Sequence, residues 1–349
     1  MTVYGRRRRR VLLGVVLALF LAHAAFAAAG HLLNAKGRAY VSPVRWPQQG
    51  QAVLVLGNGR LTASPREQPA AIASLAKVMT AYVTLERYPL SGAQDGFTIT
   101  VTATQARAEA QDAAQGQSVV AVQAGEQLTE RQLLEALLIP SGNNVAGILA
   151  DLVAGSETGF IAEMNAKARA LGMDHTVYTD PSGLDPSTVS TAADQLLVFQ
   201  QAMRFPVFQQ IVSMASVTLP VAGTVTNYDP LITQGYAGKT GSDSAAGGCL
   251  AFFTHVTVGG RLMTAVGVVL GQGQGSNTSA LLAAAGEAAE QLIDSASSAA
   301  RERAAGASGA VSDPRGNAGG HRHPLLPAPV APRHSPAVDA ITTRRRTHE

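Results

Sequence analysis

Residues 73–80 read Ala73-Ser74-Leu75-Ala76-Lys77-Val78-Met79-Thr80, a serine and a lysine set in an apolar helical pattern. Ser74 and Lys77 are three residues apart at the predicted start of a helix, so their side chains lie on one face of it. Serine is a weak nucleophile until a base takes its proton, and a lysine can be that base only if its pKa is depressed. The spacing of the following apolar residues predicts a core on the opposite face: Leu75, Val78, Met79, Tyr82 and Leu85.

Lysine is rare in this chain, which contains 23 arginines and four lysines: Lys36, Lys77, Lys167 and Lys239. Arginine stays protonated and serves wherever only a positive charge is needed, whereas a lysine can lose its proton. The scarcity therefore suggests a role for lysine in which arginine would fail.

Two further polar motifs follow in the chain. Ser141-Gly142-Asn143-Asn144 forms a turn between a helix that Thr129 caps and Pro140 stops and a second apolar helix over residues 145–153. We expect this turn to be exposed on top of the helix pair. Lys239-Thr240-Gly241-Ser242 lies on a predicted strand. Three motifs in this order, each in a suitable element, are far less expected by chance than one serine–lysine pair.

The remaining pattern predicts an antiparallel sheet. Residues 51–56 and 60–62 read as strands joined by an Asn-Gly turn, and 248–256 with 261–270 as a hairpin around a Gly-Gly turn. An alanine-rich helix over residues 279–299 is expected to lie across that sheet.

Further helices are predicted over residues 157–171, ended by Gly172, and from Ser190 or Thr191 to about residue 203. Residues 95–127 contain one strand-like run and otherwise predict loop and short strand.

The two ends of the chain differ from its centre. In residues 1–29, five arginines precede an apolar run, which is typical of a signal peptide or of an uncleaved signal anchor. Residues 301–349 are rich in glycine, alanine, proline, histidine and arginine without periodicity and predict a disordered tail. Residues 30–300 then form one folded domain.

Charge and histidine placement exclude several classes of partner. The net charge is +3, yet residues 11–300 carry 14 basic and 20 acidic side chains, so no nucleic-acid surface is predicted. His31, His175 and His255 show no metal-ligand spacing, and neither a metal nor another cofactor is expected.

Over roughly residues 38–275 the chain resembles the serine-type D-alanyl-D-alanine carboxypeptidases, the low-molecular-mass penicillin-binding proteins. The likeness covers these stretches: Ala73–Thr80, Leu133–Asn144, Met164-Asn165, Leu171–Met173, Gly183–Asp185, Thr191–Asp194, Thr226-Asn227 and Gly238–Gly241. It implies an α+β fold of the β-lactamase/transpeptidase type, in which an antiparallel sheet flanked by helices meets an all-helical lobe. The active site would lie in the cleft between them.

The resemblance also implies roles for single residues. Ser74 would attack the carbonyl of the penultimate D-alanine in a peptidoglycan stem peptide, giving an acyl-enzyme. Lys77 would be the base, and its pKa must then fall from about 10.4 toward neutrality, at a cost of about 4 kcal/mol. Burial and the charge of Lys239 both act in that direction. Ser141 would relay a proton to the leaving amine, and Asn143 would hold Lys77 and the substrate amide.

Substrate binding is implied in the same way. Lys239 and Thr240 would receive the terminal carboxylate, and Gly241 would let the substrate backbone approach the strand. The backbone N–H groups of Ser74 and Ser242 would form the oxyanion hole, in which one donor is typically worth about 3–4 kcal/mol.

Two positions depart from the family pattern: Ala76 stands where threonine is common and Gly238 where isoleucine is usual. Neither change removes a reacting group. A DD-endopeptidase or a β-lactamase is the first alternative, but a β-lactamase needs a glutamate that activates water, and Glu157 and Glu163 lie on a helix that reads as packed. A catalytically idle cell-wall-binding protein of the same fold is the second alternative.

We therefore expect an exported, extracytoplasmic DD-carboxypeptidase that β-lactams inhibit. It would be secreted, or anchored to the outer face of the cytoplasmic membrane through an uncleaved N-terminal segment alone. Two other patterns are interpreted as structural: Cys249 as a small core residue, and Asp180 with Asp185 as turn formers in a segment rich in proline and glycine.

Overall fold

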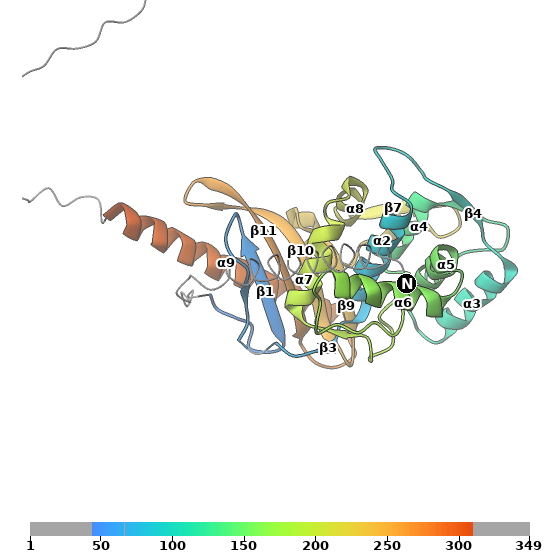
Figure 1. Cartoon of the computed structure of the whole chain (residues 1–349), viewed down its shortest axis with the longest axis horizontal. Coiled ribbons are helices and arrows are strands. Elements are labelled where there is room, and N and C mark those ends of the chain that lie inside the picture. Colours follow the sequence, from blue (N-terminus) through green and yellow to red (C-terminus); the bar gives the residue numbers. More distant parts are fainter. Residues whose placement is uncertain (1–43, 66, 310–349) are drawn as a thin grey trace, which may run out of the picture. The chain divides into compact units, whose positions relative to one another are not determined.

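The computed structural model describes residues 44–65 and 67–309. The predicted signal or anchor segment lies outside these residues. The centre of the fold is a five-stranded antiparallel sheet with strand order β2-β1-β11-β10-β9 (Figure 1). Its strands are β1 (Gln51–Leu56), β2 (Thr62–Ala63), β9 (Ala237–Asp243), β10 (Gly247–Val258) and β11 (Arg261–Gln272).

Both predicted hairpins form. Strands β10 and β11 pair from Val258 and Arg261 onward, and Gly259 and Gly260 take the left-handed backbone that their tight turn requires. Strand β1 pairs with β11 over its whole length and with β2 over two residues. The first strand of the described chain, β1, therefore lies beside the last one, β11.

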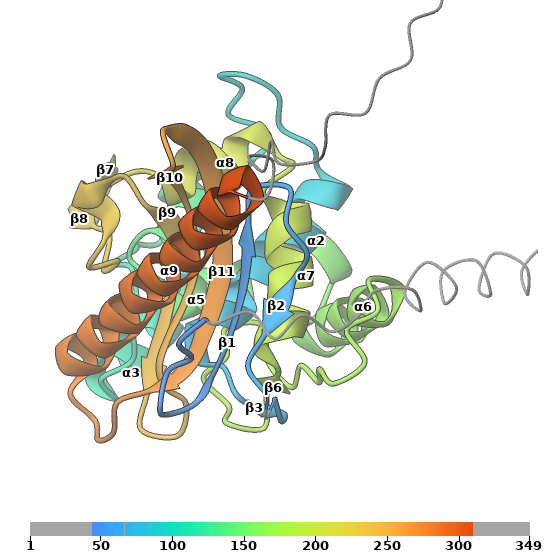
Figure 2. The same cartoon turned by 90° about the vertical axis from the view of Figure 1, so that its left-hand side faces the viewer.

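Helix α9 (Thr278–Gly309) lies across one face of this sheet, as predicted (Figure 2). Its apolar side and that sheet face share one cluster: Ala52, Leu54, Leu250, Phe252, Val269, Ala285, Ala289, Leu292 and Ile293. The helix approaches the sheet closely at Gly248, where a Cβ would lie 1.9 Å from the carbonyl oxygen of Leu281.

The boundary predicted for the C-terminal tail is wrong. Helix α9 continues to Gly309, whereas disorder was expected from residue 301. The first five residues of this continuation, 301–305, are arginine, glutamate and alanine, which favour a helix, and residues 306–309 contain no proline. Residues 310–349 lie outside the described residues.

The opposite face of the sheet carries α7 (Ala192–Ala202), and α2 (Ala76–Arg87) packs against α7 (Figure 1). Every residue of α2 from Ala76 to Leu85 is buried. The short 3-10 turn η1 (Ala73–Leu75) contacts β9 and leads directly into α2. The Ser74–Lys77 segment thus lies where the sheet meets the helices.

An all-helical lobe completes the fold and confirms the predicted fold class. It contains α3 (Ala103–Ala114), α4 (Glu130–Leu138), α5 (Asn143–Ala154), α6 (Glu157–Ala170) and α8 (Pro206–Val212). The capping box predicted at Thr129 is present, and Gly155 and Gly172 follow α5 and α6 in left-handed conformation. Thr191 caps α7, also as predicted.

Helix α3 was not predicted, because residues 95–127 were expected to be loop and short strand. Thr102 and Gln105 form a capping box at its start. None of its residues is buried, so the sequence shows no apolar stripe by which the helix could be recognised.

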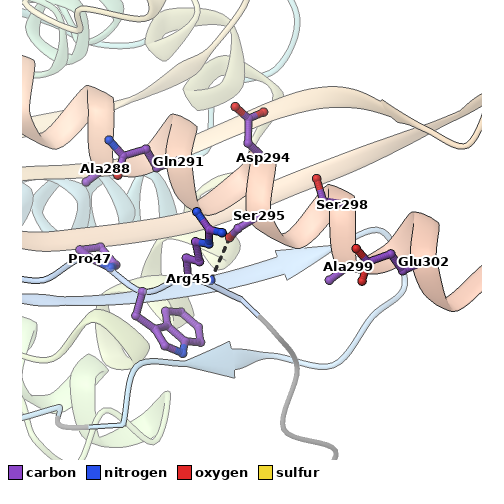
Figure 3. A pocket seen from close by; sticks show the side chains of 10 residues that line it. Arg45, Pro47, Ala288, Gln291, Asp294, Ser295, Ser298, Ala299 and Glu302 are labelled. Carbon is purple, nitrogen blue, oxygen red and sulfur yellow. Dashed lines mark hydrogen bonds between the residues drawn. The ribbon is translucent and has the colours of Figure 1, made fainter.

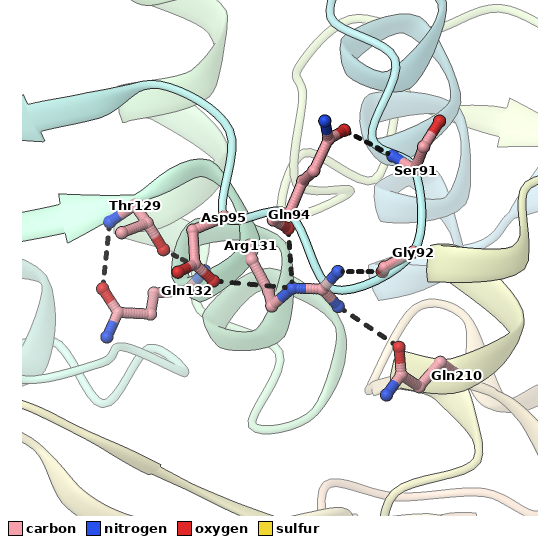
Figure 4. A network of polar contacts seen from close by, with 8 residues as sticks. All are labelled: Ser91, Gly92, Gln94, Asp95, Thr129, Arg131, Gln132 and Gln210. Carbon is pink, nitrogen blue, oxygen red and sulfur yellow. Dashed lines mark hydrogen bonds and ion pairs between the residues drawn. The ribbon is translucent and has the colours of Figure 1, made fainter. Parts of the chain in front are cut away.

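Arg131 ties the loop before β4 (Thr98–Thr100) to the helical lobe (Figure 4). Its guanidinium donates to the carbonyl oxygens of Gln94 and Gly92 at 3.0 and 2.7 Å and to Gln210 Oε1 on α8 at 3.3 Å. It also forms an ion pair with Asp95 at 3.7 Å.

Small sheets and a turn fill the connections. Strand β3 (Ala70–Ala71) pairs with β6 (Val189–Ser190), β4 with β5 (Gln127–Thr129), and β7 (Ser216–Leu219) with β8 (Gly223–Thr226). The 3-10 turn η2 (Ile232–Gln234) precedes β9. Within the part of the chain described above, no single helix is long and apolar enough to cross a membrane. Helices α5 and α6 reach that length only together and are bent by 84°.

Candidate active site

Ser74 stands in η1, immediately before α2. The preceding residue, Ala73, has φ 45°, and Ser141 has φ 65°. Over the described residues, these are the two non-glycine positions in the left-handed region. Such backbone costs about 1–2 kcal/mol per residue and persists where the surroundings impose it. Both strained residues belong to predicted site motifs.

Lys77 lies one helical turn after Ser74 and is fully buried. Its Nζ has three close oxygen partners: Ser74 Oγ at 2.7 Å, Asn143 Oδ1 at 2.7 Å and the Ser182 carbonyl oxygen at 3.0 Å. An amide oxygen and a carbonyl oxygen only accept hydrogen bonds, whereas a hydroxyl also donates. The two N–H groups of a neutral lysine can therefore go to Asn143 and Ser182, which leaves its lone pair for the Ser74 proton.

The environment favours that neutral form. Burial lowers the pKa of Lys77 well below its usual range, and the charge of Lys239 lowers it further, while the carboxylate of Asp180 raises it. The two causes expected from the sequence both act, and burial is the larger.

Ser141 is buried, and the expectation of an exposed turn is wrong. Two hydrogen bonds hold the turn against its neighbours: Gly142 N donates to the carbonyl oxygen of Ala136, and Asn143 N donates to that of Ser118. Lys239 Nζ donates to Ser141 Oγ at 3.0 Å and to the Thr240 carbonyl oxygen at 2.8 Å. Burial lowers the pKa of Lys239 to about 7, although the charge of Asp229 raises it.

Asn143 opens helix α5 and links Lys77 to a residue that the sequence did not reveal. While Asn143 Oδ1 accepts from Lys77, its Nδ2 donates to Gln117 Oε1 at 3.1 Å. Gln117 follows α3 in an irregular stretch, and no motif or periodicity marks it. The Ser182 carbonyl was missed for the same reason, since a main-chain group has no signature in sequence.

Strand β9 carries the predicted carboxylate-binding residues beside the serine. Lys239 and Thr240 are buried, and a Cβ on Gly241 would lie 3.0 Å from Ser74 N. Ser242 follows on the same strand, opposite Gly248 of β10. The pairing of the Ser74 and Ser242 N–H groups as an oxyanion hole stays a prediction.

The segment between α6 and β6 closes the site from the other side. Thr80 Oγ1 on α2 donates to the Pro181 carbonyl oxygen at 2.6 Å, and Lys77 reaches that of Ser182. At Gly183, φ is +79° and a Cβ would lie 1.8 Å from the Ala73 carbonyl oxygen. This segment therefore packs directly against the strained turn that carries Ser74.

A cavity of about 490 Å³ extends from Asn143 and Ser182 along the helical lobe. Carboxylates contribute much of its lining: Asp112, Asp151, Glu157, Asp180 and Asp185. Glu157 and Glu163 were expected to be packed, but both are exposed, and Glu157 lines this cavity. Burial raises the pKa of Glu157, as do the charges of Asp180 and Asp151.

The other candidates are structural. Cys249 is buried in β10, and burial raises the pKa of its thiol to about 12. Asp180 and Asp185 accept hydrogen bonds within their own loop, in keeping with turn formation. Among residues 44–65 and 67–309, no three His, Cys, Asp or Glu side chains are grouped so that they could hold a metal. His31 lies outside those residues.

Another hollow, of about 620 Å³, lies between residues 45–47 and α9 (Figure 3). Its polar lining includes Arg45, Asp294 and Glu302, and Arg45 N donates to Ser295 Oγ at 3.1 Å. None of the predicted site residues lines it, so the cluster of side chains around Ser74 and Lys77 is the candidate active site.

Known proteins share this sequence pattern. The profile of a family described as D-alanyl-D-alanine carboxypeptidase matches residues 50–273. A D-alanyl-D-alanine carboxypeptidase of Mycobacterium tuberculosis is 37% identical over 211 residues, which span 57% of this chain and 68% of that protein. A D-alanyl-D-alanine endopeptidase of Escherichia coli is 30% identical over 200 residues, spanning 53% of this chain and 59% of the relative.

Solved structures share the fold. The Streptomyces K15 DD-transpeptidase superposes with a TM-score of 0.60 at 24% identity, covering 72% of this chain and 99% of that one. An evolved putative penicillin-binding protein homolog from Mycobacterium tuberculosis gives a TM-score of 0.58 at 28% identity, covering 80% and 98%.

Proposed function

The chain belongs to the D-alanyl-D-alanine carboxypeptidase family, and we propose that it uses Ser74 to remove the terminal D-alanine from peptidoglycan stem peptides. The observation that carries the proposal is the contact of each lysine with a serine: Lys77 with Ser74 at 2.7 Å, and Lys239 with Ser141 at 3.0 Å. A buried lysine with a depressed pKa beside a serine hydroxyl is the arrangement of an activated nucleophile.

Acylation begins when Ser74 Oγ attacks the carbonyl carbon of the penultimate D-alanine and Lys77 Nζ takes the hydroxyl proton. The carbonyl oxygen of the tetrahedral intermediate accepts hydrogen bonds from the N–H groups of Ser74 and Ser242. Ser141 Oγ passes a proton to the amine nitrogen of the terminal D-alanine, and the C–N bond breaks. In the overall balance, the proton that Lys77 takes from Ser74 replaces the one that Ser141 gives up, so that free D-alanine and an ester on Ser74 remain.

Deacylation follows the same path with water as the nucleophile. Water loses a proton to Lys77 and adds to the ester carbonyl, and Ser74 Oγ leaves and is reprotonated. The shortened stem peptide departs as a carboxylate. Neither half-reaction, as proposed, uses a metal or another cofactor.

Lys239 and Thr240 select the substrate end. The free carboxylate of the terminal D-alanine lies against the Lys239 ammonium and the Thr240 hydroxyl, and both side chains are buried enough for that contact to be strong. Gly241 leaves room for the substrate backbone along β9, since any side chain there would meet Ser74 N.

A β-lactam enters the same chemistry with one difference. Attack by Ser74 opens the lactam ring, but the expelled amine stays covalently attached to the acyl group. It cannot diffuse away as D-alanine does, and it obstructs the approach of water. Inhibition by β-lactams is therefore part of the proposal.

Export is proposed on the sequence of residues 1–29, since peptidoglycan lies outside the cytoplasmic membrane. The protein would be secreted or held by that segment. An endopeptidase is the second candidate, because two relatives with that name are 34% identical over 141 residues and 30% identical over 200 residues. A catalytically idle wall-binding protein is disfavoured by the occupied serine and lysine positions.

The test uses purified protein with a labelled penicillin and, separately, with a peptide that ends in D-Ala-D-Ala and a cross-linked dimer. Wild type should take the label and release D-alanine, whereas Ser74→Ala should do neither. Cleavage of the dimer without release of D-alanine would indicate the endopeptidase, and rapid turnover of penicillin would indicate a β-lactamase. A wild type inert to all substrates would leave the idle wall-binding protein.

A further inference from the structure

One carboxylate holds the loop that carries the third Lys77 contact. Asp180 Oδ2 accepts from Ser182 Oγ at 2.6 Å, from Leu184 N at 2.9 Å and from Ser182 N at 3.2 Å. Its Oδ1 accepts from Thr188 Oγ1 at 2.7 Å. Hydrogen bonds to an ionised acceptor are roughly twice as strong as neutral ones. Four of them on a single side chain fix the loop on both sides of the Ser182 carbonyl.

That carbonyl decides how Lys77 is oriented. A neutral amine has two N–H groups, and the structure offers two pure acceptors for them, the Ser182 carbonyl oxygen and Asn143 Oδ1. With both occupied, the lone pair faces Ser74 Oγ. If the Ser182 carbonyl moved away, one N–H would turn toward Ser74, and the lone pair would no longer accept the hydroxyl proton.

We infer that Asp180 is a positioning residue for the catalytic lysine: it orients the Ser182 carbonyl, which holds Lys77 Nζ with its lone pair toward Ser74. Asp180 contacts no reacting atom and acts through Ser182. The inference rests on the proposed function, because it concerns the base in the Ser74 reaction. The bond from Thr80 Oγ1 to the Pro181 carbonyl oxygen anchors the adjacent peptide group to the same helix.

The charge of Asp180 does not help Lys77 to act as a base. Two ionisable groups act on Lys77: Lys239 lowers its pKa and Asp180 raises it, so the carboxylate works against a neutral base. Glu157 faces Asp180 from α6 and adds further negative charge. The useful contribution of Asp180 is therefore its four accepted hydrogen bonds.

Two substitutions separate these effects. Asp180→Asn keeps an oxygen for the donors of Ser182 and Leu184, and its amide can donate to Thr188 Oγ1. Asp180→Ala removes the clamp. Both remove the charge, so the acidic limb of the acylation–pH profile should move to lower pH in both. Only Asp180→Ala should lower the plateau rate constant at saturating labelled penicillin, by about 10- to 100-fold, as expected for a displaced base. Asp180→Asn should stay within about threefold of wild type.

Asp174→Ala, which removes an exposed carboxylate upstream in the same connection, is the matched control and should leave plateau and profile unchanged. Thermal unfolding of each variant confirms the folded fraction. If Asp180→Ala does not fold, Ser182→Ala replaces it, because it deletes the 2.6 Å bond to Asp180 and leaves the carbonyl. A plateau about five- to tenfold lower than that of wild type is then expected. Equal plateaus for the variant used and Asp180→Asn overturn the inference. A wild type that is never acylated refutes the proposed function instead.

Discussion

Lys77 Nζ lies 2.7 Å from Ser74 Oγ, and Ser74 is the one partner among the three that can give it a proton. The other two partners, Asn143 Oδ1 and the Ser182 carbonyl, have only lone pairs to offer. The hydrogen-bond geometry thus fits the proposed direction of proton transfer, from serine to lysine. This direction exists only while the amine is neutral.

Lys77→Arg should abolish acylation although the positive charge is retained. A guanidinium keeps its proton at every accessible pH and cannot serve as the base. The loss of general-base catalysis is expected to lower the acylation rate constant by about 10²- to 10⁴-fold. Labelling with fluorescent penicillin, followed in time, measures it.

Lys167→Arg is the matched control, since Lys167 lies on the surface of α6 and pairs with Glu86. It should acylate like wild type. Substantial acylation of Lys77→Arg would show that another group is the base.

Asp229→Asn should lower the pH above which substrate binding weakens. The charge of Asp229 supports the protonated form of Lys239, whose pKa burial lowers to about 7. Without that charge, the Lys239 ammonium, the proposed partner of the substrate carboxylate, loses its proton at a lower pH. KM for a D-Ala-D-Ala peptide should match wild type well below pH 7 and rise several-fold above it, since each unit of pKa changes the charged fraction tenfold.

The control for this change is Glu290→Gln, which removes an α9 charge that acts on Tyr236. Its KM–pH curve should follow that of wild type. A uniform rise in KM at every pH for Asp229→Asn would mean that the residue shapes the site and does not set the charge of Lys239.

Gly183→Ala should damage both stability and acylation. Its Cβ would lie 1.8 Å from the Ala73 carbonyl oxygen, so the turn carrying Ser74 must move. We expect a loss of about 3–5 kcal/mol in the free energy of unfolding, the range of a severe clash with backbone strain. Urea unfolding and penicillin labelling measure the two effects.

Gly172→Ala isolates the backbone part of that cost. Gly172 has φ +75°, close to the value at Gly183, but nothing lies within 4 Å of the added methyl group. Only the left-handed penalty of about 1–2 kcal/mol should appear, with normal acylation. An equal loss of unfolding free energy in the two variants would show that the clash with the Ala73 carbonyl oxygen does not contribute.

Much of this fold was predictable because its elements carry local signals. The Gly259-Gly260 turn, the Thr129 capping box and the periodic apolar residues of α9 each specify an element without reference to the rest of the chain. Helix α3 carries only one such signal, the capping box of Thr102 and Gln105, and because it buries no residue no apolar periodicity supports it.

The proximity of the motif side chains was predictable, whereas the groups that hold them in place were not. These side chains belong to short motifs, and the structure brings Ser74 and Asn143 into contact with Lys77, and Ser141 into contact with Lys239. Gln117 and the Ser182 carbonyl reach the site through packing of distant segments, which no spacing in the sequence encodes. Burial of Ser141 was missed for the same reason.

Glu130→Gln should stabilise the protein at neutral and higher pH. Glu130 is buried at the start of α4, its Oε1 has no hydrogen-bond partner among the described residues, and burial raises its pKa to about 7. A carboxyl group whose folded pKa is raised contributes its stability below the unfolded value of 4.5, and loses it as pH rises through about 7. Wild type should therefore lose up to about 3 kcal/mol across that window, whereas the glutamine variant should not.

The measurement is the free energy of unfolding in urea at several pH values between 4 and 8, on wild type, Glu130→Gln and Glu163→Gln, which changes an exposed carboxylate on α6. The two curves for wild type and Glu130→Gln should meet near pH 4.5 and separate above it, with the variant more stable. The helix dipole at the start of α4 favours the charged glutamate by about 0.3–1 kcal/mol. It therefore reduces the expected difference in unfolding free energy between the two proteins without reversing it. A pH-independent difference, or a less stable variant at pH 8, would show that the Glu130 carboxylate is satisfied in solution.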